Sequence, residues 1–378
     1  MLQIESIESI EAVREADWNA LVSDNNPFLK HQFLIALERH RCVSAELGWR
    51  PRHLVGRADG RLVAAAPLYL KENSYGEFVF DFAWAQAYQQ HKLAYYPKLV
   101  SSIPYTPATG SRLLIAKGMD RPRAAEALLE AARALADREG ASSLHWLFLP
   151  EDEQLLLEKQ GLMSRIDVQF HWENRDYRDF EQFLEGLTSK RRKNIRRERR
   201  RVAEAGVRLR LLHGDEVTDD EWHRFAGFYA KTFEERYSLP TLNASFFAEV
   251  GRTLGRQVIL VLAYQGDECV AGALMFRSDR VLYGRHWGAF VDIEGLHFEA
   301  CYYRGIEYAI NEGLQRFEPG AQGEHKIWRG FLPTITRSCH WIRNEAFSHA
   351  IGDFLAREAP AILDYKETLA QSSPYRSD

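Results

Sequence analysis

The spacing of hydrophobic positions changes several times along the first part of the chain, and each spacing predicts an element. Apolar residues recur at helical spacing over 10–22 and again over 27–38, which predicts two short helices. Two apolar runs of strand character follow, at 52–57 and 61–70. The Asp59-Gly60 dipeptide lies between them and favours a tight turn, so these runs are expected to form a β-hairpin.

The same order of elements returns in the second half. Residues 240–249 match the 27–38 helix at a Pro, a Leu and a Phe. Apolar runs at 258–264 and 270–276 then flank a Gly-containing turn, and the second run is similar to 63–69 position by position. A helix with a Glu-Gly end and a short strand come next in each half: Glu139-Gly140 before 143–148, and Glu312-Gly313 before 315–317. Because several successive elements agree in order, the chain is predicted to consist of duplicated α/β domains.

Length and composition agree with two domains. The chain has 378 residues, of which 46% are hydrophobic and 27% charged, and this is typical of a globular protein with room for more than one core. We expect an N-terminal domain over 1–165, a C-terminal domain over 166–342, and a terminal helix and tail over 343–378.

The terminal segment is expected to be only partly ordered. Residues 344–371 have a helical pattern that is interrupted at Pro360, since proline removes a helix hydrogen bond. The polar tail 372–378 is expected to be disordered.

The sequence contains no export or metal-binding pattern. No apolar run is long enough to span a membrane, and the N-terminus lacks the basic-then-apolar order of a signal peptide. The four cysteines have no CxxC spacing, and the histidines show no ligand spacing. We therefore expect a cytoplasmic protein with no metal and no disulfide framework.

An aromatic-rich insertion over 78–110 distinguishes the first half from the second. Its last part, 97–110, contains three prolines and is expected to be a stiff loop. Aromatic rings with polar tips are typical of preformed ligand pockets, and we select Trp84 and Tyr105 as candidate substrate contacts. The alternative is an irregular flap that covers core.

Basic residues are concentrated in one stretch of the second half. Residues 190–201 contain nine basic residues and one acid, a net charge of +8, which leaves −12 for the rest of a chain whose total is −4. Thr188 or Ser189 is expected to cap a helix here, which brings cations to its first turn and favours phosphate binding. The candidate contacts are Lys190, Arg191, Arg192, Lys193 and Arg196. A solvated basic helix face is the alternative.

A loop over 318–331 gathers ionisable side chains and glycines. Glycine supplies positive φ or close backbone approach, so such a loop is a candidate for contact with a ligand. Its candidate catalytic residues are Glu318, Glu324, His325, Lys326 and Arg329. The acids and the histidine are candidate bases, whereas the two cations are candidate contacts for an oxyanion or a phosphate. A surface turn, with Glu324 and Arg329 as a plain ion pair, is the alternative.

Four further residues are expected to face the same cleft and contact substrate. Arg285, His286 and Trp287 end a strand that follows the second hairpin, and Tyr302 lies on the helix that precedes the loop.

Several longer motifs resemble a known family. The stretches at 84–88, 95–99, 104–110, 297–303 and 318–326 are similar to FemAB-like proteins, a bacterial group of predicted N-acyltransferases. The tandem halves and the 188–197 helix also resemble, more distantly, the Fem transferases that add amino acids to peptidoglycan precursors. The resemblance implies an α/β fold of two tandem GNAT-like (acyl-CoA N-acyltransferase) domains, with mixed sheets flanked by helices.

The resemblance also implies a reaction and a site. In the relatives a Phe-Lys pair supplies a functional lysine near the aminoacyl donor; Lys326 stands at that position here, with His325 in place of the aromatic residue. The implied activity is transfer of an acyl or aminoacyl group to an amine, on a cell-wall precursor or another phosphate-bearing acceptor. The implied donors are aminoacyl-tRNA or acyl-CoA, with no tightly bound cofactor.

Other activities are less well supported. Acyl-CoA enzymes of this fold carry a Gln/Arg-x-x-Gly-x-Gly/Ala loop, and the nearest match, Arg285 to Phe290, fails at its last position. This favours aminoacyl-tRNA or another donor, with an acyl-CoA-dependent acetyltransferase of a small amine as the alternative. A serine hydrolase is disfavoured because no Gly-x-Ser-x-Gly elbow is present. A second alternative is a non-catalytic protein that binds a glycan-peptide or RNA phosphate.

Overall fold

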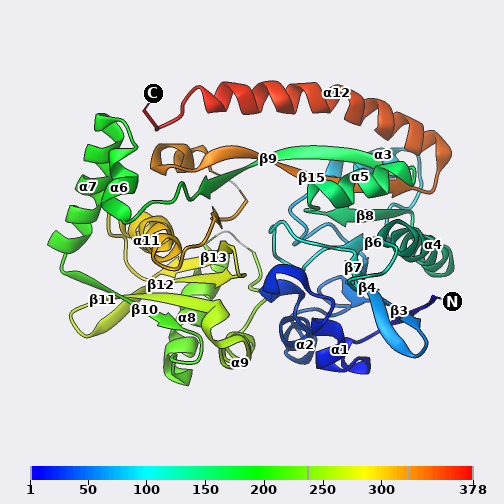
Figure 1. Ribbon diagram of the computed structural model, residues 1–378, viewed down its shortest axis with the longest axis horizontal. Helices are drawn as coiled ribbons and strands as arrows, with labels where there is room; N and C mark the ends of the chain where they lie inside the picture. The colour runs from blue at the N-terminus through cyan, green and yellow to red at the C-terminus, as the bar shows by residue number, and fades with distance from the viewer. Residues whose placement is uncertain (1, 236–237, 322, 377–378) are drawn as a thin grey trace. The chain divides into compact units, whose positions relative to one another are not determined.

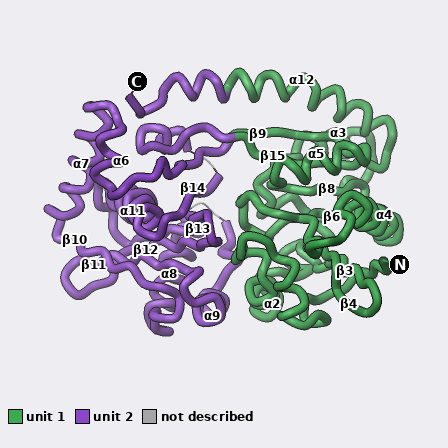
Figure 2. The backbone as a smooth tube through the Cα atoms, in the orientation of Figure 1, with its two compact units in different colours: residues 1–168, 335–365 green, residues 169–334, 366–378 purple. Residues whose placement is uncertain are grey.

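The computed structural model describes residues 2–235, 238–321 and 323–376, which fall into two compact units (Figure 2). Unit 1 comprises residues 1–168 and 335–365, and unit 2 comprises 169–334 and 366–378. Two segments therefore differ from the expected domain limits: 335–342 and 343–365 both make their contacts within unit 1. The chain passes between the units three times.

The smaller sheet of unit 1 is antiparallel, in the order β1-β3-β4-β7. Its strands are β1 (Gln3–Ile7), β3 (His53–Ala58), β4 (Arg61–Ala66) and β7 (Leu114–Ile115). The predicted first hairpin is β3–β4: Ala58 pairs with Arg61, and both Asp59 and Gly60 have positive φ. These conformations match the twist of the flanking strands, which is why Asp-Gly is favoured at this turn.

The second sheet of unit 1 has the order β15-β8-β6-β5-β2. Its strands are β2 (Trp49–Pro51), β5 (Tyr69–Lys71), β6 (Lys98–Ser101), β8 (Ser143–Leu147) and the later part of β15 (Leu332–Ile342). Only the β6–β8 pair is parallel. Helix α4 (Arg121–Glu139) connects β7 to β8 and ends, as predicted, at a left-handed Gly140. Its apolar stripe, including Leu128 and Ala132, packs into the core of the unit.

The remaining helices of unit 1 include two that the sequence did not predict. They are α3 (Phe82–Gln90), within the aromatic insertion, and α5 (Glu151–Lys159). The others are α1 (Glu15–Asn19), α2 (His31–Arg39) and most of α12 (Glu345–Ala370), with short 3-10 turns at Ile10–Ala12, Ser23–Asn25 and Pro27–Leu29. Strand β6 pairs in parallel with β8, just as β13 (Val281–Ala289) pairs in parallel with β14 (Arg316–Glu318) in unit 2.

Unit 2 is built around a sheet in the order β10-β11-β12-β13-β14-β9 (Figure 1). Its strands are β9 (Met163–Glu173, which enters from unit 1), β10 (Val207–His213), β11 (Val258–Gln265), β12 (Glu268–Arg277), β13 (Val281–Ala289) and β14 (Arg316–Glu318). The second predicted hairpin is β11–β12. Its helices are α6 (Phe180–Glu185), α7 (Ser189–Glu204), α8 (Asp219–Glu234) and α9 (Ala244–Leu254), with a 3-10 turn at Gly255–Gln257.

The parallel pair β13–β14 opens a gap in this sheet. The strands pair only over Val281–Tyr283 and Arg316–Glu318, after which Gly284 and Pro319 leave the ladder. A bulge adds to the divergence, because the register against β12 shifts by one residue and makes Arg285 the extra residue. The connection between the two strands consists of α10 (Leu296–Phe298), a π-helical turn η5 (Glu299–Tyr303) and α11 (Arg304–Asn311).

The terminal segment differs from its predictions. Helix α12 continues through Pro360, whose exposed position leaves the unpaired carbonyl one turn earlier accessible to water. The tail is ordered through residue 376: Thr188 N–H donates to the Pro374 carbonyl, and the Tyr375 hydroxyl donates to the Gly330 carbonyl at 2.8 Å. Residues 377–378 lie outside the described residues. Over the described chain, no helix has both the length and the hydropathy that crossing a membrane requires.

Candidate active site

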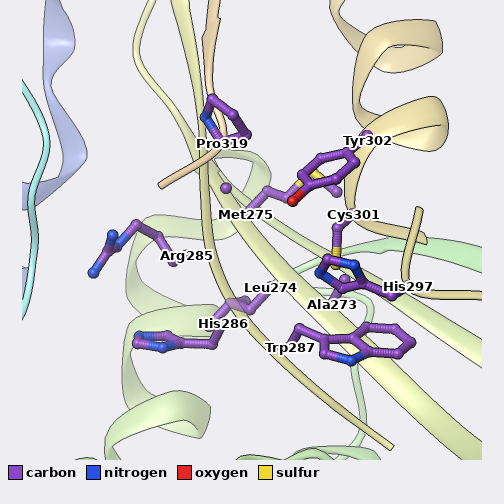
Figure 3. A pocket seen from close by; sticks show the side chains of 11 residues that line it. Ala273, Leu274, Met275, Arg285, His286, Trp287, His297, Cys301, Tyr302 and Pro319 are labelled. Carbon is purple, nitrogen blue, oxygen red and sulfur yellow. The ribbon is translucent and has the colours of Figure 1, made fainter. Parts of the chain in front are cut away.

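A cavity of about 110 Å³ lies where β13 and β14 separate (Figure 3). Its walls come from β12, from Gly284 to Trp287 on β13, from the α10–η5 connection and from Pro319. The π-helical turn at η5 places Cys301 and Tyr302 on this wall. Such single-turn π-segments within α-helices are frequent at functional sites.

Tyr302 lines the cavity and contacts two histidines, of which His297 also lines it and His325 does not. The Tyr302 hydroxyl and the His325 Nε2 are 3.1 Å apart, and His297 packs edge-on against the Tyr302 ring at 5.2 Å. Burial lowers the pKa of His325 and brings the pKa of His297 to about 4, with the nearby cations acting in the same direction. Both imidazoles are therefore neutral at pH 7, and a neutral imidazole is able to accept a proton.

Lys326 lies behind the cavity wall, not in it. Its side chain is only 3% exposed, and its Nζ donates to the Gly320 carbonyl at 2.9 Å. Burial lowers its pKa to about 8, an effect that the adjacent Cys301 thiol partly opposes. Burial also raises the pKa of Cys301, so this thiol is protonated. Lys326 thus carries a positive charge at neutral pH but loses its proton more readily than an ordinary lysine.

Arg329 connects the loop to helix α7. Its guanidinium donates to Glu198 at 2.8 Å and to the Tyr303 hydroxyl at 3.1 Å, and it lies 3.3 Å from the centre of the Phe298 ring. The Tyr303 hydroxyl also donates to Glu198. Arg329 is therefore engaged in holding the 3-10 turn η6 (Glu324–Arg329), which carries His325 and Lys326.

The two acids of the loop have different surroundings. Glu318 is 3% exposed, at the end of β14, and lies 3.6 Å from Arg316. Glu324 is exposed at the start of η6. None of Glu318, Glu324 and His325 lines the cavity itself, but His325 contacts the hydroxyl of Tyr302, which does, so the geometry favours His325 as the group that exchanges protons there.

The three predicted residues of β13 all border the cavity, but they point in different directions (Figure 3). Trp287 packs edge-on against His297 at 5.4 Å. His286 packs against Tyr229 at 5.0 Å, and burial lowers its pKa. Arg285, at the bulge, has its pKa lowered by burial to about 10 and stays protonated at neutral pH.

The basic helix α7 begins after Thr188, but the predicted side-chain cap is absent, since Thr188 makes no capping hydrogen bond with its side chain. Part of its charge is neutralised within unit 2. Arg196 pairs with Glu181, and Arg191 stacks over Trp328 at 4.8 Å. Among the described residues, five cations of this helix have no ion-pair or hydrogen-bond partner: Lys190, Arg192, Lys193, Arg197 and Arg200. These cations form a surface that is able to bind phosphate groups.

Trp84 and Tyr105 belong to unit 1 and do not line the cavity of unit 2. Trp84 is 5% exposed and stacks near His145 in the core. The Tyr105 hydroxyl donates to the Cys42 carbonyl at 2.9 Å. For these two residues the structure agrees with the alternative of a segment that covers core.

Sequence reasoning did not select His297, Cys301 or Glu198. His297 and Cys301 are one helical turn apart, but their common exposure to the cavity depends on the π-turn between them. Glu198 is the single acid of the basic stretch. A single acid within a basic stretch indicates a specific ion-pair partner, and that partner is Arg329.

The architecture defines a class of protein. Each unit joins a hairpin to a crossover helix and a further strand, and unit 2 has its cavity where the parallel pair separates. This is a tandem GNAT fold, found in N-acyltransferases.

The chain belongs to the FemAB-like family. The family model, described as peptidoglycan biosynthesis/recognition, matches residues 9–377. Among solved structures, FemX has a TM-score of 0.52 at 13% identity, over 90% of this chain and 98% of that one. The C-terminal domain of a putative lysylphosphatidylglycerol synthetase from Agrobacterium fabrum has a TM-score of 0.54 at 11% identity, over 92% and 95%.

A tandem GNAT protein from the clavulanic acid biosynthesis pathway has a TM-score of 0.46 at 13% identity, over 90% of this chain and 98% of that one. At these identities the structural likenesses concern the fold alone. Among curated protein sequences, none matches the chain.

Proposed function

We propose that this protein transfers an acyl or aminoacyl group to an amine, with the cavity of unit 2 as the place of reaction. The observation that carries the proposal is Tyr302, which lines a cavity between separating parallel strands and contacts His325, with Lys326 also behind the wall. Membership of the FemAB-like family supports a transferase that acts in peptidoglycan biosynthesis.

The reaction requires a free amine, a stabilised oxyanion and two substrates held together. His325 is neutral at pH 7 and accepts the proton of the acceptor ammonium, either directly or through the Tyr302 hydroxyl. The amine then attacks the donor carbonyl, and negative charge develops on the carbonyl oxygen. The positive charge of Lys326, in a site of low dielectric, stabilises that oxygen. Collapse of the intermediate forms the amide and expels the donor's leaving group, which takes up the second proton of the attacking nitrogen, while His325 releases the first proton to solvent.

The starts of the two crossover helices favour a donor other than acyl-CoA. A pyrophosphate binds well at a helix N-terminus when backbone N–H groups are free and no acid is near. In unit 2 the exposed Asp292 lies shortly before α10, and Glu294, which also precedes it, is paired with Arg201. In unit 1 Asp120 caps α4 and accepts the Arg123 N–H. Both positions disfavour a second anion, so we propose aminoacyl-tRNA as the donor, with acyl-CoA as the alternative.

The acceptor that fits best carries phosphate. The unpartnered cations of α7 are suited to the diphosphate of a nucleotide-linked cell-wall precursor or to tRNA phosphates. Single neutralising substitutions there are expected to weaken binding and to reduce its dependence on salt.

The test combines retained ligands with turnover. Mass spectrometry of small molecules that remain on gently purified protein identifies acceptor candidates. Transfer is then measured with aminoacyl-tRNA or acyl-CoA and a nucleotide-linked peptidoglycan precursor. We expect Tyr302→Phe and Lys326→Met each to lower kcat about a hundredfold, while precursor binding changes less than about twofold. Lys231→Met, a change to a surface lysine of α8, is the matched control.

A second candidate is a binding protein without turnover. It is favoured by one observation, namely that Lys326 and Arg329 both make structural contacts within their own loop region. If the precursor binds but no donor supports transfer, this candidate replaces the transferase.

A further inference from the structure

In one segment of unit 1, the usual burial of apolar side chains and exposure of charged side chains is reversed. Along Glu77 to Phe82, an irregular loop that leads into helix α3, the side chains of Glu77 and Asp81 are buried and those between and after them are more exposed. Here the acids are inside and the rings outside. Glu77 and Asp81 are each 3% exposed. The three phenylalanines are exposed, Phe78 to 37%, Phe80 to 49% and Phe82 to 48%. Hydrophobic burial alone favours the opposite arrangement.

This reversal is imposed by interior contacts. Lys98 is fully buried and donates to Glu77 at 2.7 Å and also to Asp81. The Asp81 carboxylate accepts the Tyr95 hydroxyl as well. A buried ammonium requires such partners, so the two acids are fixed inward and the neighbouring phenylalanines are fixed outward.

The backbone of the segment is also anchored from within. Lys71 donates to the Tyr75 carbonyl at 3.0 Å, the Tyr105 N–H donates to Gly76, and Arg165 donates to the Phe80 carbonyl at 2.7 Å. The rings are therefore presented to solvent by a supported loop. Collapse of the segment onto the core would break these bonds.

The exposed rings form one aromatic surface. Phe80 and Phe82 stack at 5.9 Å, and Tyr75, which is 72% exposed, lies 6.4 Å from Phe82. Leu93, 44% exposed, joins Phe82 in lining a hollow of about 450 Å³. This size lies within the range of about 300–1,000 Å³ usual for ligand sites. Contiguous exposed apolar patches of this kind mark contacts with proteins, ligands or membranes.

The charged residues near this surface indicate which of these classes of partner it fits. Over residues 72–96, two of the three acids are buried, and the third, Glu72, is paired with Arg50 at 2.7 Å. In the same stretch Lys92 is exposed, lines the hollow and has no ion-pair or hydrogen-bond partner among the described residues. The exposed amides of Gln86 and Gln89 line the same hollow. Beyond this stretch, Phe80 also borders Arg165 and the exposed Asp167, and Arg165 is paired with Glu358. At the hollow itself, outward rings beside a cation and amide donors suit the boundary between acyl chains and phosphate headgroups.

We propose that this aromatic surface of unit 1, formed by Tyr75, Phe80, Phe82 and Leu93, docks the protein on a phospholipid bilayer. The rings enter the interface, and a headgroup phosphate occupies the hollow next to Lys92. The proposal rests on unit 1 alone and is independent of the transfer reaction.

The test is co-sedimentation of the full chain with vesicles of phosphatidylcholine and phosphatidylglycerol at 3:1. We expect binding, and we expect the triple variant Tyr75→Ser/Phe80→Ser/Phe82→Ser to weaken it about a hundredfold, since three rings that enter the interface are lost. Leu155→Ser removes a 50% exposed leucine from α5 of the same unit and is expected to leave binding unchanged. Phe80→Ser alone, with an expected loss of about fivefold, provides a milder variant if the triple one misfolds.

A further comparison isolates the headgroup contribution. Lys92→Glu is expected to weaken binding to the mixed vesicles more than to pure phosphatidylcholine. The proposal is overturned if the wild-type chain sediments with neither vesicle, or if the triple variant binds as tightly as wild type. It is also overturned if the triple variant changes only the oligomeric state in light scattering, because the surface is then a contact between copies.

Discussion

At the scale of single residues, the most informative group is Lys326. It is buried, its pKa of about 8 is close to neutral pH, and its Nζ donates a hydrogen bond to the carbonyl of Gly320. These properties suit a charge that stabilises an oxyanion, but they also cost stability, because a buried ammonium is poorly solvated. Both consequences depend on pH and are measurable.

If Lys326 acts as a cation, the rate of transfer falls as pH rises through about 8, where this lysine loses its proton. A rate that rises through the same pH would contradict the cationic role and indicate a base. Lys326→Arg, which stays charged, is expected to remove the fall on the alkaline side even if it slows the reaction.

The same pKa shift affects stability. The folded-state pKa of about 8 is below the ordinary value of 10.5, so between these values the unfolded chain binds more protons. The free energy of unfolding is therefore expected to increase as pH rises from 8 to 10.5. Lys326→Met should abolish this increase. Denaturant unfolding of both chains across this range measures the difference; parallel curves would contradict the shift.

At the scale of elements, the turn η6 is held from two sides. Helix α7 reaches it through Glu198 and Arg329, and the C-terminal tail reaches it through Tyr375 and Gly330. The candidate base and the candidate cation both lie on this turn. Its position therefore depends on contacts from elements distant in the sequence.

Removal of the α7 contact is expected to be costly. Glu198→Ala leaves the nearly buried Arg329 without its carboxylate, and we expect a loss of about 3 kcal/mol in the free energy of unfolding. Glu204→Ala, at the exposed end of the same helix, is the matched control and should change stability by less than about 0.5 kcal/mol. Equal effects of the two substitutions would show that helix α7 and not the ion pair is responsible.

The tail contact is expected to be weaker. Tyr375→Phe removes one hydrogen bond to the Gly330 carbonyl and should cost about 1 kcal/mol. Tyr75→Phe, which changes a 72% exposed tyrosine of unit 1, provides the control in thermal melts. A larger effect on turnover than on stability would indicate that the tail positions η6 for the reaction.

At the scale of the whole molecule, the units are not separable by one cut. Unit 1 needs residues 335–365, since Ser338–Ile342 of β15 pairs with β8 and Ile351 and Leu355 of α12 pack with Trp84. A fragment of residues 1–168 is therefore expected to expose apolar core and the edge of β8. Its circular dichroism and its unfolding midpoint should fall well below those of the full chain. A fragment that unfolds cooperatively at the midpoint of the full chain would contradict this expectation.

The sequence by itself determined the local and repeated features. The hairpin at Asp59-Gly60, the helix end at Gly140, the second hairpin and the tandem order follow from neighbouring residues, because φ preferences and hydrophobic period act over a few positions. The family motifs, which are contiguous, were recognisable for the same reason.

Only the tertiary structure decided which side chains meet. Arg329 was expected to contact substrate or Glu324, yet it pairs with Glu198, 131 residues away in the sequence. Lys326 lies behind the cavity wall, and the acids Glu77 and Asp81 turn inward around Lys98. Such pairings depend on strand register and on the desolvation of buried charge, which are set by the complete fold and not by neighbouring residues.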